Sequence, residues 1–259
     1  MKVKDIMTKD IITIDKDVDL KHVLNLMEKY KITKIPVVEE KKLVGIVTDN
    51  IIAYKLGSIR KKGIPPSRLH ASSVTEKNIE IITPDTDIKT ILKKVGEPGP
   101  TMLCIVEKEI LLGVITKADL LPLVNSNKQV REIMNRKIQI VSPDDRVIHA
   151  RRIMINANIA RLPVVDQGKL VGIISDNEIV FALANIKKSF PMGKQKHQLD
   201  ELLIRNVMKT PAFWTEPNIT AKEAATLMLK NNIGALPIIE HGKLIGIVSR
   251  TDLLNTIPR

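Results

Sequence analysis

The sequence predicts an α/β protein made of four copies of one small α+β unit, arranged as two paired halves. Three observations support this fold class. A proline and a glycine recur four times at one spacing, each recurrence is flanked by helical apolar patterns, and the 259 residues suit about two domains of roughly 150 residues. We therefore expect the first copy to pair with the second, and the third with the fourth.

The repeat is defined by a proline that comes nine residues before a glycine. Three copies have this proline, and Cys104 takes its place in the second copy. Each glycine is followed, three residues later, by a hydroxyl side chain. From the first copy to the fourth, the sets are Pro36, Gly45 and Thr48; Cys104, Gly113 and Thr116; Pro163, Gly172 and Ser175; Pro237, Gly246 and Ser249. This register predicts four equivalent folded units.

Each copy predicts the order strand, helix, hairpin, helix. Apolar residues at helical spacing, such as Val23, Leu26 and Met27, predict a helix before the proline. Two apolar runs separated by a short polar turn predict a hairpin with buried strands. The hydroxyl residue is a favoured N-cap for the second helix. The proline and glycine are expected to be structural, since glycine allows close approach of another backbone.

The pattern breaks at residues 125–127, where we place the boundary between the halves. The predicted modules are residues 1–127, with copies at about 1–56 and 69–125, and residues 128–259, with copies at about 128–186 and 201–259.

Composition predicts a cytoplasmic protein that does not cross a membrane. The single cysteine cannot form an internal disulfide, and we expect it to be an inert buried thiol. An acid follows closely on the first methionine, where a secretory signal needs apolar residues, and no run reaches about 18 apolar residues.

The net charge of +12 favours anionic partners. Aromatic residues make up only 2%, which argues against single-stranded nucleic acid but leaves duplex binding open.

No pattern in the sequence indicates catalysis. The phosphate-binding loop Gly-x-x-x-x-Gly-Lys-[Ser/Thr] and the nucleophile pattern Gly-x-Ser-x-Gly are both absent. The five histidines do not cluster with cysteines or carboxylates at metal-ligand spacing. We therefore expect a protein that is not an enzyme and that has no metal site.

The repeats resemble the CBS (cystathionine-β-synthase) domain family. The likeness rests on the opening Val-Lys-Asp-Ile-Met, the Pro-Val-Val run and the Gly-Ile-Val-Ser-Arg-Thr-Asp-Leu-Leu ending. It implies four CBS domains paired into two Bateman modules, whose clefts bind AMP, ADP, ATP or S-adenosylmethionine. The four-copy arrangement is also similar to that of the γ subunit of AMP-activated protein kinase.

Ribose binding needs an acceptor for two adjacent hydroxyls, and the even copies supply one. A carboxylate three residues after the hydroxyl lies on the same helix face as that hydroxyl. Asp119 follows Thr116 and Asp252 follows Ser249 in this way, so we assign the acids to ribose and the hydroxyls to phosphate. In the odd copies, the position of this carboxylate is taken by Ile51 and Glu178. Whether Glu178 also accepts a hydroxyl, and so whether the odd clefts are occupied, stays open.

Phosphate binding needs a cation, which the resemblance places two residues before the proline position. Lys34 and Arg161 stand there in the odd copies, whereas the even copies have Met102 and Ala235. We expect Lys34 to face the ligand held by Asp119, and Arg161 the ligand held by Asp252, which gives one site per module. The second module should favour phosphorylated ligands more strongly, because arginine binds phosphate bidentately.

Adenine binding is assigned to the apolar segment that enters each even cleft. The candidate residues are Ile82 and Thr83 in copy two, and Trp214 and Thr215 in copy four. Trp214 is predicted either to stack on the base or to be a core residue.

The predicted function is a non-catalytic regulator that senses cellular energy by binding adenine nucleotides between paired repeats. Ligand binding would shift the conformation presented to a protein effector, and a homodimer is expected. A sensor of S-adenosylmethionine, a basic regulator associated with nucleic acid, and a dimerisation module for a separate enzyme or transporter remain alternatives.

Overall fold

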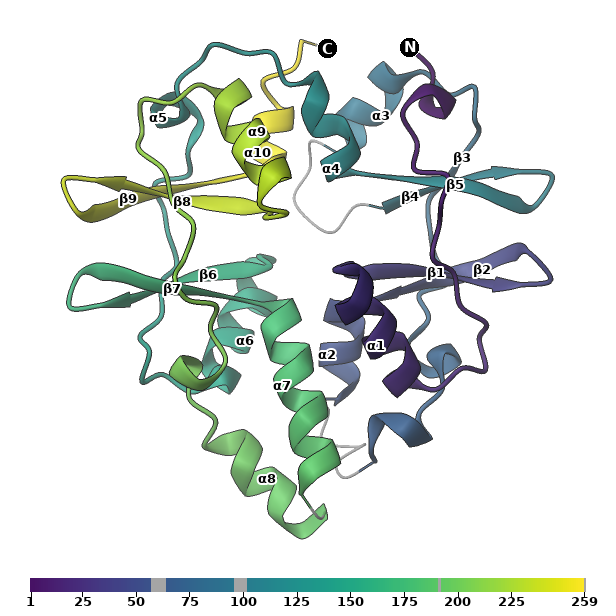
Figure 1. Ribbon diagram of the computed structural model, residues 1–259, viewed down its shortest axis with the longest axis horizontal. Helices are drawn as coiled ribbons and strands as arrows, with labels where there is room; N and C mark the ends of the chain where they lie inside the picture. The colour runs from purple at the N-terminus through teal and green to yellow at the C-terminus, as the bar shows by residue number, and fades with distance from the viewer. Residues whose placement is uncertain (57–63, 96–101, 191, 259) are drawn as a thin grey trace.

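The computed structural model describes residues 1–56, 64–95, 102–190 and 192–258, and all four copies contain a helix, a hairpin and a second helix (Figure 1). Copy 1 has α1 (Leu20–Tyr30), β1 (Lys34–Glu39), β2 (Lys42–Thr48) and α2 (Asp49–Leu56). Copy 2 has β3 (Ile81–Ile82), α3 (Ile88–Val95), β4 (Met102–Glu107), β5 (Ile110–Thr116) and α4 (Lys117–Leu120). Copy 3 has α6 (Val147–Ala157), β6 (Arg161–Asp166), β7 (Lys169–Ser175) and α7 (Asp176–Ser189). Copy 4 has α9 (Ala221–Lys230), β8 (Ala235–Glu240), β9 (Lys243–Ser249) and α10 (Arg250–Leu254). The predicted fold class is confirmed.

Short helices occupy the segments that lead into and link the copies. The 3-10 helices are η1 (Val3–Asp5), η3 (Pro66–Arg68), η4 (Ala71–Val74), η5 (Leu121–Leu123) and η6 (Ile204–Asn206), and the remaining α-helices are α5 (Val130–Ile133) and α8 (Met192–Asp200). Helix α8 extends beyond the four-copy body, at the end opposite the two termini (Figure 1).

The predicted strand before each helix is shorter than expected. It forms a two-residue strand only in copy 2, as β3, and the other copies have single parallel bridges such as Ile14 to Val37. The same segment of copy 1 also bridges Thr8 to Val114 of copy 2. Because the chain crosses from one copy to the next here, it pairs with each hairpin for only one or two residues.

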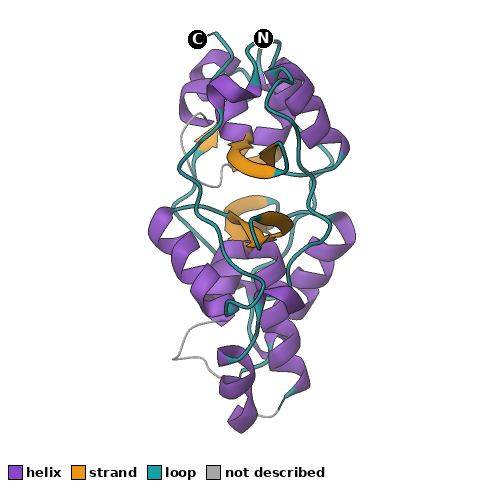
Figure 2. Cartoon of the chain, turned by 90° about the vertical axis from the view of Figure 1, so that its left-hand side faces the viewer, coloured by secondary structure: helices purple, strands orange, loops and turns teal. Residues whose placement is uncertain are grey.

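The four hairpins form the two middle layers of the molecule, and helices cover both outer sides (Figure 2). Strands β1 to β5 make one sheet in the order β1-β2-β5-β4-β3, in which Lys42 of copy 1 pairs with Ile110 of copy 2. The hairpins of copies 3 and 4 are separate two-stranded sheets.

Neighbouring copies are interleaved, because each packs its leading segment on the other. At the start of copy 1, the Val3 N–H donates to Thr86 O of copy 2 at 2.9 Å. In return, the Leu20 N–H of copy 1 donates to Leu69 O, which precedes copy 2, at 2.8 Å. We call copies 1 and 2 module 1.

Copies 3 and 4 exchange their leading segments in the same way. The Val130 N–H donates to Ile219 O of copy 4 at 2.8 Å, and the Val147 N–H of copy 3 donates to Leu202 O at 2.8 Å. We call copies 3 and 4 module 2.

The interleaving explains the repeated glycine. A Cβ at Gly113 would lie 2.7 Å from Met7 Sδ, and one at Gly172 would lie 2.8 Å from Met208 Sδ. Each of these methionines belongs to the leading segment of the neighbouring copy. The predicted close approach at the glycine is therefore confirmed, and the atoms that approach come from the paired copy.

Two large apolar cores join the modules. Copies 1 and 3 share one core, in which α2 and α7 lie side by side and bury Ile52 and Val180 completely (Figure 1). Copies 2 and 4 share the other core, which includes Leu120 and Leu253 next to the short helices α4 and α10. None of the helices described here is both long and apolar enough to cross a membrane.

Replacing Gly45 with alanine should lower the free energy of unfolding by about 2–3 kcal/mol. Its Cβ would contact Thr75 and lie 2.5 Å from the backbone oxygen of Glu76, which cannot rotate away. Gly242→Ala is the matched control, because a Cβ there meets nothing within 4 Å and only the φ of +76° opposes it. The control should lose about 1 kcal/mol in chemical denaturation. Equal losses for the two variants would contradict this account of the glycine.

Candidate ligand-binding site

The inner ends of the four hairpins meet at the centre of the molecule, while their turns point outward (Figure 1). At each inner end, the first residue of the hairpin pairs with the hydroxyl residue that precedes the second helix. The pairs are Lys34 with Thr48, Met102 with Thr116, Arg161 with Ser175, and Ala235 with Ser249. The predicted phosphate residues therefore lie at equivalent positions facing the centre.

The predicted ribose carboxylates are fixed at the first turn of their helices. Asp119 Oδ2 accepts hydrogen bonds from the Thr116 N–H and Oγ1, both at 2.7 Å. Asp252 Oδ2 accepts equivalent bonds from the Ser249 N–H at 2.7 Å and Oγ at 2.6 Å. Each carboxylate thus caps a helix and is held in one orientation.

The second carboxylate oxygen distinguishes the two even copies. Oδ1 of Asp119 accepts a hydrogen bond from Thr8 Oγ1 at 2.9 Å. Oδ1 of Asp252 accepts no hydrogen bond from the described residues. A ribose hydroxyl can therefore bond Asp252 directly, whereas at Asp119 it has to displace Thr8.

The odd copies differ from each other at this slot. Glu178 accepts hydrogen bonds from the Ser175 N–H at 3.0 Å and from Ser175 Oγ, so it caps its helix as the aspartates do. In copy 1, Ile51 provides no acceptor, and its N–H donates to Thr48 Oγ1 at 3.2 Å. Glu178 of copy 3 therefore makes the same helix-capping contact as the aspartates of the even copies, although it is a glutamate.

Six charged side chains from all four copies form what we call the central charge cluster: Lys34, Asp49, Lys117, Arg161, Asp176 and Arg250. Four are cations and two are acids, and further acids interact with members of the cluster: Asp252 with Lys117, Asp119 with Arg250, and Glu178 with Asp176. Lys34 interacts with Asp49, Arg161 and Arg250. The cation that interacts with Asp119 is Arg250 of copy 4, and the predicted approach of Lys34 to a ligand on Asp119 stays a prediction.

Sequence reasoning missed Lys117 and Arg250. Both directly follow the hydroxyl cap, at a position where the odd copies have Asp49 and Asp176. A comparison of the four copies at this one position would have revealed the alternation of acid and base.

Burial changes the proton affinity of the cluster. Together with the nearby Lys34, it lowers the pKa of Lys117 to about 8, while Asp252 opposes the shift. Burial also lowers the pKa of Arg250 to about 10, again with a contribution from a like charge, Arg161. Because cations that are desolvated and close together repel, an anion bound among them would be stabilised.

The acids of the cluster are also buried. Burial, and to a smaller extent the neighbouring Asp49, raises the pKa of Asp176 to about 7, while Arg161 opposes the shift. Burial likewise raises the pKa of Asp49. Asp176 therefore carries only part of its negative charge near pH 7.

Trp214 is 52% exposed, so the alternative prediction that it is a core residue is wrong. The bridge from Thr215 to Ile238 and the pairing of Ile82 with Ile105 show that Thr215 and Ile82 are equivalent. The predicted adenine residues of the two copies were therefore offset by one position.

The counterpart of Trp214 in copy 2 is Ile81, which the prediction missed and which is also 52% exposed. The backbone groups of the predicted threonines are already bonded. The Thr215 N–H donates to Pro237 O at 3.0 Å, and Thr83 O accepts from the Thr86 N–H at 3.1 Å. Side chains, rather than these backbone groups, offer free surface to a base.

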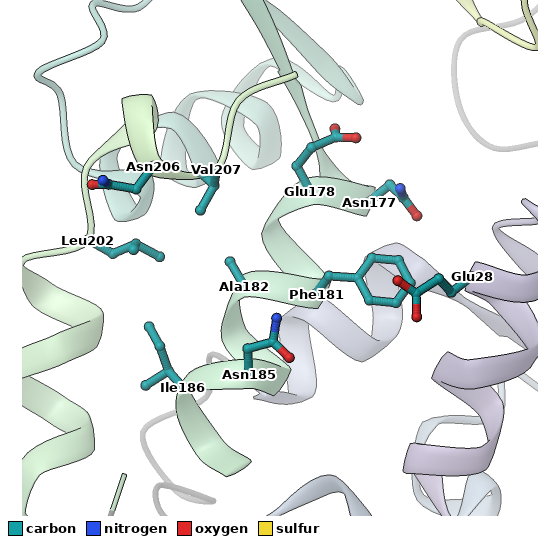
Figure 3. Close-up of a pocket in the computed structure, with 10 residues that line it drawn as sticks. All are labelled: Glu28, Asn177, Glu178, Phe181, Ala182, Asn185, Ile186, Leu202, Asn206 and Val207. Carbon is teal, nitrogen blue, oxygen red and sulfur yellow. The ribbon is translucent and has the colours of Figure 1, made fainter. Parts of the chain in front are cut away.

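A surface hollow of about 430 Å³ lies along α7 (Figure 3). Its lining residues are Glu28, Asn177, Glu178, Phe181, Ala182, Asn185, Ile186, Leu202, Asn206 and Val207. Phe181 and Glu28 lie on one side of the helix, and Leu202 and Val207 on the other (Figure 3). None of the predicted ligand residues lines this hollow.

Two further features concern chemistry outside the cluster. Cys104 is fully buried, which confirms that part of its prediction, and burial raises the pKa of its thiol to about 12, which disfavours the reactive thiolate. Within the described ranges, no three His, Cys, Asp or Glu side chains come together as metal ligands would.

The CBS domain family model matches four segments of the chain, residues 3–57, 71–126, 130–185 and 204–259. The chain is 28% identical over 273 residues to uncharacterized protein MJ1404 of Methanocaldococcus jannaschii, covering 98% of this chain but only 61% of that protein. It is 25% identical over 258 residues to an uncharacterized 33.4 kDa protein in a ribosomal RNA operon of Thermofilum pendens, covering 92% and 84%.

The crystal structure of protein MJ1225 from Methanocaldococcus jannaschii has the same four-copy arrangement. It superposes with a TM-score of 0.85 over 98% of this chain and 99% of that chain, at 23% identity. MJ1225 is described as a proposed archaeal homologue of the γ subunit of AMP-activated protein kinase. At this level of identity, the similarity shows the fold alone.

Asp176→Asn should raise stability more at pH 8 than at pH 5. The pKa of Asp176 is 3.8 in its ordinary state and about 7 in the fold, so the folded chain holds a proton that the unfolded chain has lost. Its contribution to stability therefore falls as the pH rises between these values. Removing the charge should add about 1–3 kcal/mol at pH 8 and less at pH 5.

Thermal unfolding of both proteins at the two pH values measures this effect. The charges that face Asp176 are Asp49, Arg161, Arg151 and Glu178, and all are kept in the variant. Asp166→Asn, at an exposed site on β6, is the matched control and should change little. A gain that is the same at pH 5 and pH 8 would contradict the raised pKa.

Proposed function

Since the chain belongs to the CBS domain family, we propose that it is a non-catalytic regulatory protein that binds an adenine nucleotide between paired repeats. The observation that carries this proposal is the central charge cluster. Four buried or half-buried cations from four different copies come together there, and the carboxylates expected to hold ribose are fixed next to two of them, Lys117 and Arg250. Several partly buried cations beside a fixed carboxylate suit a ligand that has both a phosphate and a ribose.

We assign the better-equipped site to module 2. Oδ1 of Asp252, which receives no hydrogen bond from the described residues, is assigned to the ribose. Ser249 and Arg161 are assigned to the phosphate, and Arg250 adds a second guanidinium. The exposed ring of Trp214, with Thr215 behind it, is our candidate surface for the base.

The corresponding site in module 1 uses Asp119 for ribose and Thr116 with Lys34 for phosphate. Ile82 and Thr83 are its assigned base-contacting residues. We expect it to bind more weakly, because Thr8 competes for Asp119 and lysine makes a single contact with phosphate. The module boundary is proposed at residue 127.

AMP, ADP and ATP fit the cluster better than S-adenosylmethionine does. The latter carries a positively charged sulfonium group, which the cations of the cluster repel, and it has no phosphate to bond them. Nucleic acid is a weaker candidate, because the cations of the cluster are partly buried at the centre rather than spread over an outer surface.

Signalling would follow from the position of the cluster. Because all four copies contribute to it, a bound phosphate favours the arrangement in which they approach most closely. The change is limited by the difference in ligand affinity between the two arrangements. The predicted protein effector, homodimer, energy-sensing role and cytoplasmic location stay predictions.

A thermal-shift series with AMP, ADP, ATP and S-adenosylmethionine tests the proposal. A nucleotide at 100 times its dissociation constant should stabilise the chain by about 2.7 kcal/mol. S-adenosylmethionine should give the smallest shift. Duplex DNA at low salt is included to test the alternative that the chain binds nucleic acid. Stabilisation by the duplex alone, or by none of the adenosine compounds, would contradict nucleotide binding.

Asp252→Asn should weaken AMP binding by about tenfold or more in calorimetry, since the ribose loses a charged acceptor. Glu178→Gln is the matched control, because Glu178 makes the same helix-capping contact but is not assigned to ribose. Both variants should lose similar stability, and only Asp252→Asn should lose affinity. An equal loss of affinity in the control would show that these acids act through the helix caps instead.

A further inference from the structure

The guanidinium group of Arg161 lies flat against Gly234. A Cβ built on Gly234 would be 2.7 Å from Cζ, 2.7 Å from Nη2 and 2.8 Å from Nη1 of Arg161. Three nearly equal distances mean that the plane of the group faces the glycine. The arginine belongs to copy 3 and the glycine to copy 4, so the contact crosses the cleft of module 2.

Glycine at this position is specific to copy 4. The residue directly before the first hairpin strand is Thr33, Thr101 and Ala160 in the other copies. Any of these side chains at Gly234 would occupy the place of the guanidinium. The backbone itself does not require glycine, because Gly234 is not among the residues with positive φ.

A second arginine is attached to the same turn. Nε of Arg250 donates to the backbone oxygen of Ile233 at 3.1 Å, and the Arg250 N–H donates to Gly234 O at 3.2 Å. Arg161 and Arg250 are close enough to repel each other electrostatically. The turn at Ile233 and Gly234 therefore holds two like charges side by side at the inner end of the cleft.

We propose that Gly234 is a positioning residue that holds Arg161 beside Arg250, and that this pair makes the cleft of module 2 select nucleoside phosphates over uncharged adenosine compounds. The proposal rests on the proposed function, since it assumes that an adenosine compound enters this cleft. It adds which ligand class is accepted and which residue sets that choice.

The selectivity has a simple electrostatic origin. A phosphate placed between two guanidinium groups accepts charge-assisted, bidentate hydrogen bonds from both and removes their repulsion. An uncharged adenosine leaves the repulsion between the two arginines in place and gains no charge-assisted bond from them. Phosphate recognition therefore depends on both arginines being at the turn at the same time.

Gly234→Ala is a clean test because the atoms that it displaces are the flexible end of a side chain. The three atoms nearest to the added methyl group all belong to the guanidinium, which can rotate away. The variant should fold with nearly unchanged stability. It should bind AMP about tenfold more weakly and adenosine as the original chain does.

The experiment is calorimetry of AMP and adenosine on the full chain and its variants. Wild type should bind AMP at least about tenfold more tightly than adenosine. Arg161→Ala should remove most of this difference, and adding Gly234→Ala to it should change nothing more. Arg161→Lys keeps the charge and leaves the glycine in place, yet it should also weaken AMP because lysine cannot lie flat or bind bidentately.

Gly242→Ala is the control for stability. This glycine is exposed and lies in the turn between β8 and β9, at the opposite end of the hairpin from Gly234. The variant should therefore lose stability and keep its affinity for AMP. Equal binding of AMP and adenosine by wild type, full AMP affinity in Gly234→Ala or Arg161→Lys, or a further loss in the double variant would each overturn the inference. Adenosine binding would in those cases still support the proposed function. Failure of every adenosine compound to bind wild type would overturn the proposed function itself.

Discussion

Partly buried positive charge at the meeting point of four hairpins is the constraint on which the account depends. Lys34, Lys117, Arg161 and Arg250 come from four different copies, and burial opposes the charged forms of Lys34, Lys117 and Arg250. A protein interior accepts such charge when an opposite charge pairs with it. Asp49, Asp119 and Asp252 supply part of this pairing, while burial raises the pKa of Asp176 to about 7 and so reduces its share. We propose that an anionic ligand binds beside these cations and adds to the pairing.

The fold delivers these cations through contacts between copies. Each leading segment presses on the glycine of its neighbour, which fixes the two hairpins of a module relative to each other. The modules are then joined unequally, because α2 and α7 are 8 and 14 residues long whereas α4 and α10 have 4 and 5. The shorter contact, between copies 2 and 4, is where we expect a ligand to change the arrangement most easily, and both proposed ribose carboxylates lie there.

The hairpins, helices and repeated glycine could be predicted because they depend on spacing within one copy. The residue that lies opposite each glycine, such as Met7 opposite Gly113, could not be predicted, because the contact comes from the exchange of leading segments between copies. Lys117 and Arg250 carried a signal in the alternation after the hydroxyl cap. Gly234 carried none, because its role exists only where Arg161 of another copy meets it. The adenine residues predicted for copies 2 and 4 differ by one position because the segment before each helix pairs with its hairpin for only one or two residues. So short a strand has little sequence pattern by which to align the copies.

A crystal structure of the chain with AMP tests the central claim most directly. The account predicts the phosphate within hydrogen-bonding distance of Arg161 and Arg250, with a ribose hydroxyl on Oδ1 of Asp252. An AMP molecule seated elsewhere, with the two arginines still stacked on the turn at Gly234 and no anion between them, would contradict it.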